Sequence, residues 1–251
     1  MKPASNAMKL TNKTILLTGG TSGVGLALLH SLYNRGNRLV VVGRNEKRMA
    51  ELRDGYPDAT FLSCNLSVPS EVADLIQTVQ ERFPDCSVLI NNAGVQFNYL
   101  LGDDASGQSR IGSEIQVNLT AAIQLCDALL PQLRQQPEAA IVNITSGLGI
   151  SPKRSAPVYS ATKAGLQVLT KALRYQLEDS TVQVVDVVLP LVDTPMTTGR
   201  GRGKISPKQV ADELIRGVEH GRQVVNVGKV KLFRIIHRLV PGLADRMLKN
   251  G

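Results

Sequence analysis

The chain has 251 residues, of which 43% are hydrophobic, and a formal net charge of +8 at pH 7. This length and apolar content fit one large domain with a buried core. The sequence contains no apolar run close to the roughly 20 residues of a membrane-spanning helix. It also lacks a basic segment followed by an apolar run at its start, so we expect a cytoplasmic protein.

Apolar segments alternate with helix-like segments along most of the chain. The first half predicts, in order, strand Thr14–Thr18, helix Gly25–Arg35, strand Arg38–Val42, helix Asn45–Arg53, strand Thr60–Cys64 and helix Pro69–Arg82. The second half predicts strand Val88–Asn91, helix Gly112–Leu133, strand Ala140–Ile144, helix Val158–Leu177 and strand Val182–Leu189. Asn45 and Ser67 are the expected helix N-caps. The polar, glycine-containing residues 102–113 are assigned no element before Gly112.

The strands are solid apolar runs instead of alternating ones, which is typical of strands buried on both faces. Together with the alternating helices, this predicts an α/β fold: a doubly wound (Rossmann), mainly parallel sheet with helices on both faces. Residues 1–7, including Ser5-Asn6-Ala7, look like a tag remnant or disordered end, and residues 8–251 form the single expected domain.

The cysteines and histidines give no sign of a metal site. Cys64, Cys86 and Cys126 have neither disulfide nor zinc spacing, and the three histidines are scattered. We therefore expect buried thiols in a reducing compartment and no metal.

A glycine-rich turn, Thr18-Gly19-Gly20-Thr21-Ser22-Gly23-Val24-Gly25, joins the first strand to the first helix. Gly19 permits a sharp turn, Gly23 lets backbone approach a pyrophosphate, and Gly25 lets the helix pack closely on the strand. The free N–H groups of the helix N-terminus favour phosphate binding. This context predicts a dinucleotide site.

A second constellation lies further along the chain. Tyr159 and Lys163 are four residues apart on one predicted helix, and therefore share a face. A nearby ammonium would lower the phenol pKa from its usual value near 10, so that Tyr159 could act as an acid or base. Ser146, which follows a strand, could hold the same substrate oxygen.

These motifs, with Asn91-Asn92-Ala93-Gly94 and Asn118, resemble the short-chain dehydrogenase/reductase superfamily over roughly residues 12–225. The resemblance implies a catalytic set of Asn118, Ser146, Tyr159 and Lys163, in which Asn118 positions a proton-relaying water and Lys163 also binds the nicotinamide ribose. The cofactor contacts that it implies are Gly19, Thr21, Ser22, Gly23, Val24, Gly25, Arg44, Asn65, Leu66, Asn92, Ala93, Gly94, Tyr159, Lys163, Pro190, Val192 and Thr194. It also implies a homodimer or homotetramer, formed through the two long helices.

The second strand ends in Gly43-Arg44, where relatives that prefer NAD carry an acidic residue. A guanidinium can pair with a 2′-phosphate, so we expect NADP(H) to be preferred over NAD(H). The sequence departs from the family pattern at Asn65, where an aspartate is common, and at Pro190, where glycine is usual. Pro190 therefore predicts a changed wall of the nicotinamide pocket.

The net charge is concentrated in residues 201–251, which hold 11 lysines and arginines against 4 acidic residues. From Lys229 the chain predicts two short helices that are broken at Pro241-Gly242 and form a basic extension, residues 229–251. The favoured interpretation is a helix packed over the substrate cleft or a subunit interface. Contact with an anionic membrane surface or an acidic substrate is the alternative, and nucleic-acid binding is not expected.

The sequence thus predicts an NADP(H)-dependent oxidoreductase that acts on a small carbonyl or alcohol substrate. The alternative is a non-catalytic NADP-binding regulator or scaffold, which would not need the complete catalytic set. The residues expected near the substrate suggest a mainly apolar cleft: Val95, Gln96, Leu148, Leu191 and Met196.

Overall fold

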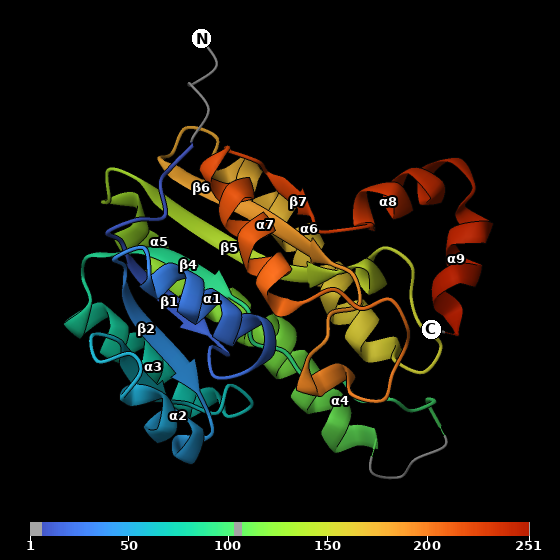
Figure 1. Cartoon of the computed structure of the whole chain (residues 1–251), viewed down its shortest axis with the longest axis horizontal. Coiled ribbons are helices and arrows are strands. Elements are labelled where there is room, and N and C mark those ends of the chain that lie inside the picture. Colours follow the sequence, from blue (N-terminus) through green and yellow to red (C-terminus); the bar gives the residue numbers. More distant parts are fainter. Residues whose placement is uncertain (1–6, 103–106, 251) are drawn as a thin grey trace.

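The computed structural model describes residues 7–102 and 107–250, and its centre is a seven-stranded sheet (Figure 1). The strands are β1 (Thr14–Thr18), β2 (Arg38–Gly43), β3 (Thr60–Ser63), β4 (Cys86–Asn91), β5 (Ala139–Ser146), β6 (Val182–Leu189) and β7 (Val224–Asn226). All neighbouring pairs are parallel, in the order β3-β2-β1-β4-β5-β6-β7. The chain therefore reverses its direction of winding between β1 and β4, which is where ligands bind in open parallel sheets.

Nine α-helices lie in the described residues. They are α1 (Gly23–Tyr33), α2 (Glu46–Arg53), α3 (Pro69–Arg82), α4 (Gly107–Ile115), α5 (Ala121–Arg134), α6 (Pro157–Gln176), α7 (Pro207–Glu219), α8 (Val230–Leu239) and α9 (Pro241–Lys249). A π-helical segment, Gln116–Thr120, joins α4 to α5. Short 3₁₀ turns occupy Gly147–Gly149 and Pro195–Thr197.

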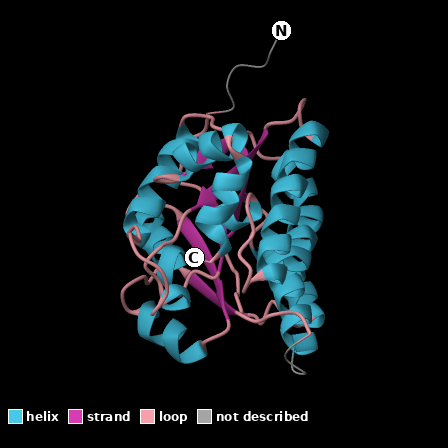
Figure 2. Cartoon of the chain, turned by 90° about the vertical axis from the view of Figure 1, so that its right-hand side faces the viewer, coloured by secondary structure: helices cyan, strands magenta, loops and turns pink. Residues whose placement is uncertain are grey.

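Helices cover both faces of the sheet, as Figure 2 shows. One apolar core cluster joins α1, α2 and α7 to one face, and a second joins α3, α5 and α6 to the other. All five residues of β1 are buried, as are all eight of β5. The predicted fold class, a doubly wound parallel sheet with strands buried on both faces, is confirmed.

The expected N-cap of α3 is wrong. Val68 is the N-cap residue, and it has no capping side chain. The Ser67 hydroxyl instead donates to Asn65 Oδ1 at 2.8 Å, within the turn after β3. The expected cap of α2 is confirmed, since Asn45 Oδ1 accepts from the Arg48 N–H at 2.9 Å.

Helix α7 and strand β7 were not expected from the sequence, and helix α4 begins at Gly107, before the predicted helix start at Gly112. In α4, the fully buried Glu114 carboxylate accepts from the Phe97 N–H at 3.0 Å and from the Tyr99 hydroxyl at 2.8 Å.

The C-terminal extension consists of α8 and α9, which stand to one side of the sheet (Figure 1). Arg234 of α8 approaches the buried Asp186 of β6 at 3.7 Å. Ser151 donates to Asp245 of α9 at 2.5 Å, and the Arg154 N–H donates to the Lys249 carbonyl at 3.0 Å. The two predicted helices and the break at Pro241 are therefore observed, and α9 is anchored to the loop that precedes α6.

The predicted tag remnant, residues 1–7, lies outside the described residues except for Ala7. Within residues 7–102 and 107–250, no helix is both long and apolar enough to cross a membrane.

Candidate active site

The glycine-rich turn forms a close-packed backbone cradle between β1 and α1. Gly19 and Gly23 have φ values of +66° and +50°, a conformation that favours glycine. A Cβ atom on Gly25 would lie 2.0 Å from the Gly19 carbonyl oxygen, so a larger residue at this position would push the turn apart. Gly19 thus has the sharp turn, and Gly25 the close packing, that their spacing predicts.

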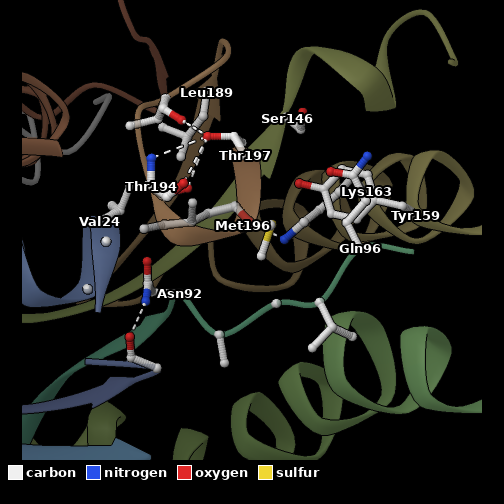
Figure 3. A pocket seen from close by; sticks show the side chains of 18 of the residues that line it. Val24, Asn92, Gln96, Ser146, Tyr159, Lys163, Leu189, Thr194, Met196 and Thr197 are labelled. Atoms are coloured by element: carbon white, nitrogen blue, oxygen red, sulfur yellow. Dashed lines mark hydrogen bonds between the residues drawn. The ribbon is translucent and has the colours of Figure 1, made fainter. Parts of the chain in front are cut away.

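Hydrogen bonds join this turn to the end of β4. The Asn92 side chain donates to the Thr18 and Gly19 carbonyls at 2.8 and 3.0 Å. Thr18 Oγ1 accepts from the Asn92 and Ala93 N–H groups, both at 3.0 Å. These bonds hold the carboxyl ends of β1 and β4 together at the switch point of the sheet (Figure 3).

The first turn of α1 opens onto this switch point. Its N-cap, Ser22, makes no side-chain cap hydrogen bond, and the turn contains no acidic residue. Backbone N–H groups at such a helix start attract an anion. The cradle and the helix start together fit the pyrophosphate of a dinucleotide.

A cavity of about 580 Å³ runs along the carboxyl edge of the sheet, from the glycine turn to Tyr159. Every residue that the sequence assigned to the cofactor lines it, as do Ser146 and the five residues expected near the substrate. Figure 3 shows Val24, Asn92 and Thr194 on one side of this cavity and Ser146, Tyr159 and Lys163 on the other. Residues from six loops thus meet in one space.

Tyr159 and Lys163 lie together on the first half of α6. Lys163 Nζ is 5.8 Å from the centre of the Tyr159 ring and donates to the Ile144 carbonyl of β5 at 2.8 Å. Only 4% of the Lys163 surface is exposed. The phenol and the ammonium therefore share the cavity, and the sheet fixes the position of the lysine.

The pKa of Tyr159 is raised to about 12, because burial disfavours the phenolate. A hydrogen bond with Ser146 and the positive charge of Arg200 oppose this rise. Burial also lowers the pKa of Lys163 to about 8, against the attraction of the Asp186 carboxylate. From the sequence we expect the Lys163 ammonium to lower the pKa of Tyr159. In the structure the groups that lower this pKa are the Ser146 hydroxyl and the Arg200 guanidinium.

Asn118 lies on the π-helical segment, and it is the one predicted catalytic residue that does not line the cavity. Its side chain accepts from the Val95 N–H and donates to the Val95 carbonyl, both at 2.8 Å. It also donates to Thr162 Oγ1 at 3.3 Å. Asn118 thereby fixes the segment after β4, whose Val95 and Gln96 form a wall of the cavity.

The opposite wall is the segment after β6. Thr197 Oγ1 donates to the Val192 carbonyl at 2.5 Å, and Thr194 caps the short turn that follows it. Val192 also forms a parallel bridge with Ile205. This wall is held by backbone pairing, although Pro190 replaces the usual glycine.

The far end of the cavity contains Arg44, Asn65 and Leu66. Arg44 is exposed, and no ion pair engages it among the described residues. A Cβ atom on Gly43 would lie 2.8 Å from Thr21 Cγ2, so a larger residue there would require the Thr21 side chain to shift. Asn65 Oδ1 is occupied by Ser67, which leaves the Asn65 amide nitrogen as the group that could reach adenine.

Residues 13–204 match the family model described as short chain dehydrogenase. The chain belongs to the short-chain dehydrogenases. It is 35% identical over 237 residues to the uncharacterised oxidoreductase DltE of Bacillus subtilis, a match that covers 90% of this chain and 92% of that protein.

Solved structures of other short-chain dehydrogenases have the same fold. One from Burkholderia cenocepacia, in complex with NADP, has a TM-score of 0.85 at 23% identity and covers 97% of this chain and 100% of that one. One from Burkholderia phymatum, in complex with NAD, has a TM-score of 0.82 at 20% identity and covers 92% of this chain and 96% of that one. Membership of this oxidoreductase family supports a nicotinamide cofactor for this dehydrogenase.

Sequence reasoning missed the residues at the substrate end of the cavity: Lys153, Arg200, Arg202, Met247 and Leu248. Met247 and Leu248 belong to α9, so the C-terminal extension is itself a wall of the dehydrogenase cavity. The apolar spacing of α9 indicated a helix packed over the substrate cleft or a subunit interface, and the structure places it against the cavity.

No group of three or more possible metal ligands occurs in the part of the chain that the structure describes. All three cysteines are free and buried. Burial raises the pKa of Cys64 and Cys86 to about 11 and that of Cys126 to about 12, which keeps the thiols protonated.

Proposed function

We propose that this short-chain dehydrogenase catalyses the NADP(H)-dependent reduction of a carbonyl compound or the oxidation of the corresponding alcohol. The observation that carries the proposal is the shared cavity: the glycine cradle opens into it at one end, and Tyr159, Lys163 and Ser146 line it at the other. A dinucleotide in the cradle would therefore extend toward the phenol.

In the direction of reduction, the Tyr159 hydroxyl gives its proton to the substrate oxygen, which the Ser146 hydroxyl also holds. Bound NADPH supplies the hydride. The buried Lys163 ammonium binds the ribose next to the nicotinamide, and Asn118 positions the wall at Val95 and a proton-relaying water.

The raised pKa of Tyr159, about 12, keeps the phenol protonated at neutral pH. The protonated form is the acid that reduction needs, whereas alcohol oxidation needs the phenolate. Oxidation should therefore accelerate as the pH rises, and reduction should be favoured near neutrality.

The preference for NADP(H) is proposed from Arg44, which lines the cavity and has no ion-pair partner in residues 7–102 and 107–250, and from the absence of an acidic residue at position 43, which is glycine. We expect kcat/KM for NADPH to exceed that for NADH in steady-state kinetics. Replacing Arg44 by Ala removes a charge-assisted hydrogen bond, and should lower kcat/KM for NADPH by about 10- to 100-fold. The value for NADH should change by less than about threefold. A wild-type preference for NADH would contradict the role of Arg44.

The mechanism is tested with Tyr159→Phe, which removes the acidic proton and keeps the ring. Aldehydes, ketones and alcohols are screened by NADPH absorbance with both proteins. We expect wild-type turnover to fall by at least about a thousandfold in the variant, since general acid catalysis and the positioning of the oxygen are lost together. NADPH affinity, measured by fluorescence, should change little. Equal turnover by the two proteins would remove the mechanism.

The alternative function, a non-catalytic NADP-binding regulator or scaffold, is not favoured. Such a protein has no need of a buried lysine next to a half-buried tyrosine, because burying an ammonium lowers its pKa and costs stability. The shared position of Tyr159 and Lys163 in the cavity therefore favours an enzyme.

A homo-oligomer is proposed from the outer faces of α5 and α6. Ile123, Val168 and Tyr175 expose 39%, 70% and 60% of their surfaces there.

The cytoplasmic location remains a prediction. For the basic extension, the lining of the cavity by α9 supports packing over the substrate cleft, and sedimentation with anionic vesicles would test the membrane alternative.

A further inference from the structure

The substrate end of the cavity is positively charged. Lys153, from the loop after β5, and Arg200 and Arg202, from the loop after β6, line it together with the catalytic residues. No aspartate or glutamate lines this cavity in residues 7–102 and 107–250. The charge at this end is therefore not neutralised by the described walls of the cavity.

The backbone around Arg200 is shaped by two glycines. Gly199 and Gly201, on either side of it, have φ values of +74° and +60°, which other residues rarely adopt. A Cβ atom on Gly201 would lie 2.3 Å from Leu191 Cδ2. Within this turn the Arg200 guanidinium donates to the Met196 carbonyl. The loop thus fixes a half-buried guanidinium at the cavity wall.

Two further observations place Arg200 near the reacting groups. Its positive charge pulls down the pKa of Tyr159, so it acts across the same space as the phenol. Burial, followed by the charge of Arg200, lowers the pKa of Lys153. Arg200 and Lys153 line the same cavity, so an anion bound between them would be attracted by both charges.

Lys204, in the same loop as Arg200, is a cation whose charge is neutralised within the protein. Lys204 Nζ lies 3.4 Å from the Asp193 carboxylate and donates to the Thr197 carbonyl at 2.7 Å. Arg200 and Lys153 have no carboxylate partner among the described residues. Lys204 therefore stabilises the loop through Asp193 and Thr197, whereas the charges of Arg200 and Lys153 remain available to a ligand.

The rest of this end is apolar. Leu148, Leu191, Met196, Met247 and Leu248 line it, the last two from α9. A substrate that fills this space would carry an apolar segment between its carbonyl group and its charge.

We infer that the substrate is a carbonyl compound with an apolar segment and a carboxylate, and that Arg200 and Lys153 bind the carboxylate. This inference rests on the proposed function. The phosphates of the cofactor have other sites, since the glycine cradle receives the pyrophosphate and Arg44 the 2′-phosphate. Arg200 and Lys153 are thus specificity residues for the substrate.

The test compares 5-oxo-5-phenylpentanoate with its primary amide, which has the same length and no charge. The wild-type enzyme should reduce the acid with a kcat/KM about tenfold or more above that of the amide, because a charged hydrogen bond is lost with the amide. Arg200→Met should lower kcat/KM for the acid by about 10- to 100-fold, mainly through KM, and that for the amide by less than about threefold. Arg200→Lys should recover part of the loss. Arg216→Met, an exposed position on α7, is the control and should resemble the wild type.

A binding measurement separates this inference from the proposed reaction. Calorimetry with 5-phenylpentanoate and 5-phenylpentanamide, which cannot be reduced, should show tighter binding of the acid, and the difference should shrink in Arg200→Met and at high salt. Lys153→Met should act in the same direction if Arg200→Met does not fold. NADPH affinity should stay within about threefold in both variants, since a site that held a cofactor phosphate would lose more.

Equal binding of acid and amide by the wild type, or equal losses for both in Arg200→Met, would overturn the carboxylate site. A large loss of NADPH affinity in that variant would assign Arg200 to the cofactor and overturn it as well. If the acid binds selectively but no carbonyl compound is reduced, the proposed function fails and the anion site stands.

Discussion

Lys163 is almost fully buried and still carries an ammonium group at neutral pH, since burial lowers its pKa only to about 8. The unfolded chain binds this proton up to a pKa near 10.4. Folding therefore costs free energy below pH 8, and the cost disappears as the pH rises from about 8 to about 10.4. The free-energy cost of burying the Lys163 ammonium therefore accompanies a positive charge that is held at one position in the cavity.

Replacing Lys163 by Met should therefore stabilise the cofactor-free protein at pH 7 while turnover is lost. The variant removes a buried charge and one hydrogen bond to Ile144, so we expect a net gain of about 1–2 kcal/mol in the free energy of unfolding. For a protein of this size the melting temperature should rise by about 2–8 °C. The gain should shrink as the pH rises above about 8 and vanish only above about pH 10.4, where Lys163 is mostly neutral in both the folded and the unfolded protein. A variant less stable than the wild type at pH 7, measured by calorimetry, would contradict the cost.

The residues that the sequence could place are those whose geometry is local. Tyr159 and Lys163 share a helix face, and the three glycines share one turn, so fixed spacing determines how they meet. Arg200 could not be placed in this way, because its direction depends on the turn between Gly199 and Gly201. Lys153 lies far from it in the chain and meets it only through the packing of two loops.

At the scale of elements, the sequence predicted the long buried strands and the helices with a clear apolar period. It did not predict β7, which has three residues and is too short to show a pattern. Helix α7 did carry a signal: Ser206 accepts from the Gln209 N–H at 3.1 Å, and Pro207 opens the helix. The π-helical turn at Gln116–Thr120 lies within the predicted helix Gly112–Leu133, and there the side chain of Asn118 pairs with the backbone of Val95, a contact distant in the chain.

At the scale of the molecule, the exposed apolar residues of α5 and α6 predict an oligomer. Light scattering should give the wild type a mass that is a multiple of 27.1 kDa. Val168→Glu places a charge in the proposed interface and should shift the protein toward 27.1 kDa. Leu239→Glu, at the exposed α8 residue with 73% of its surface accessible, is the matched control and should keep the mass of the wild type. A wild-type monomer, or dissociation only by Leu239→Glu, would contradict this interface.

The C-terminal extension, residues 229–251, contributes to the cavity. The sequence favoured packing of this extension over the substrate cleft or a subunit interface, and the structure brings Met247 and Leu248 of α9 to the cavity. Residues of α9 and of the glycine-rich turn near the start of the chain therefore line the same cavity.

Transfer of deuterium from NADPH labelled at C4 to a carbonyl substrate measures the proposed hydride transfer itself. The acid 5-oxo-5-phenylpentanoate is incubated with enzyme and with each of the two C4-deuterated stereoisomers of NADPH, and the alcohol is analysed by mass spectrometry. We predict one deuterium in the product from one stereoisomer, and no labelled product with Tyr159→Phe. If the wild-type protein binds NADPH but delivers label to neither this ketone nor any other in the panel, the account is wrong.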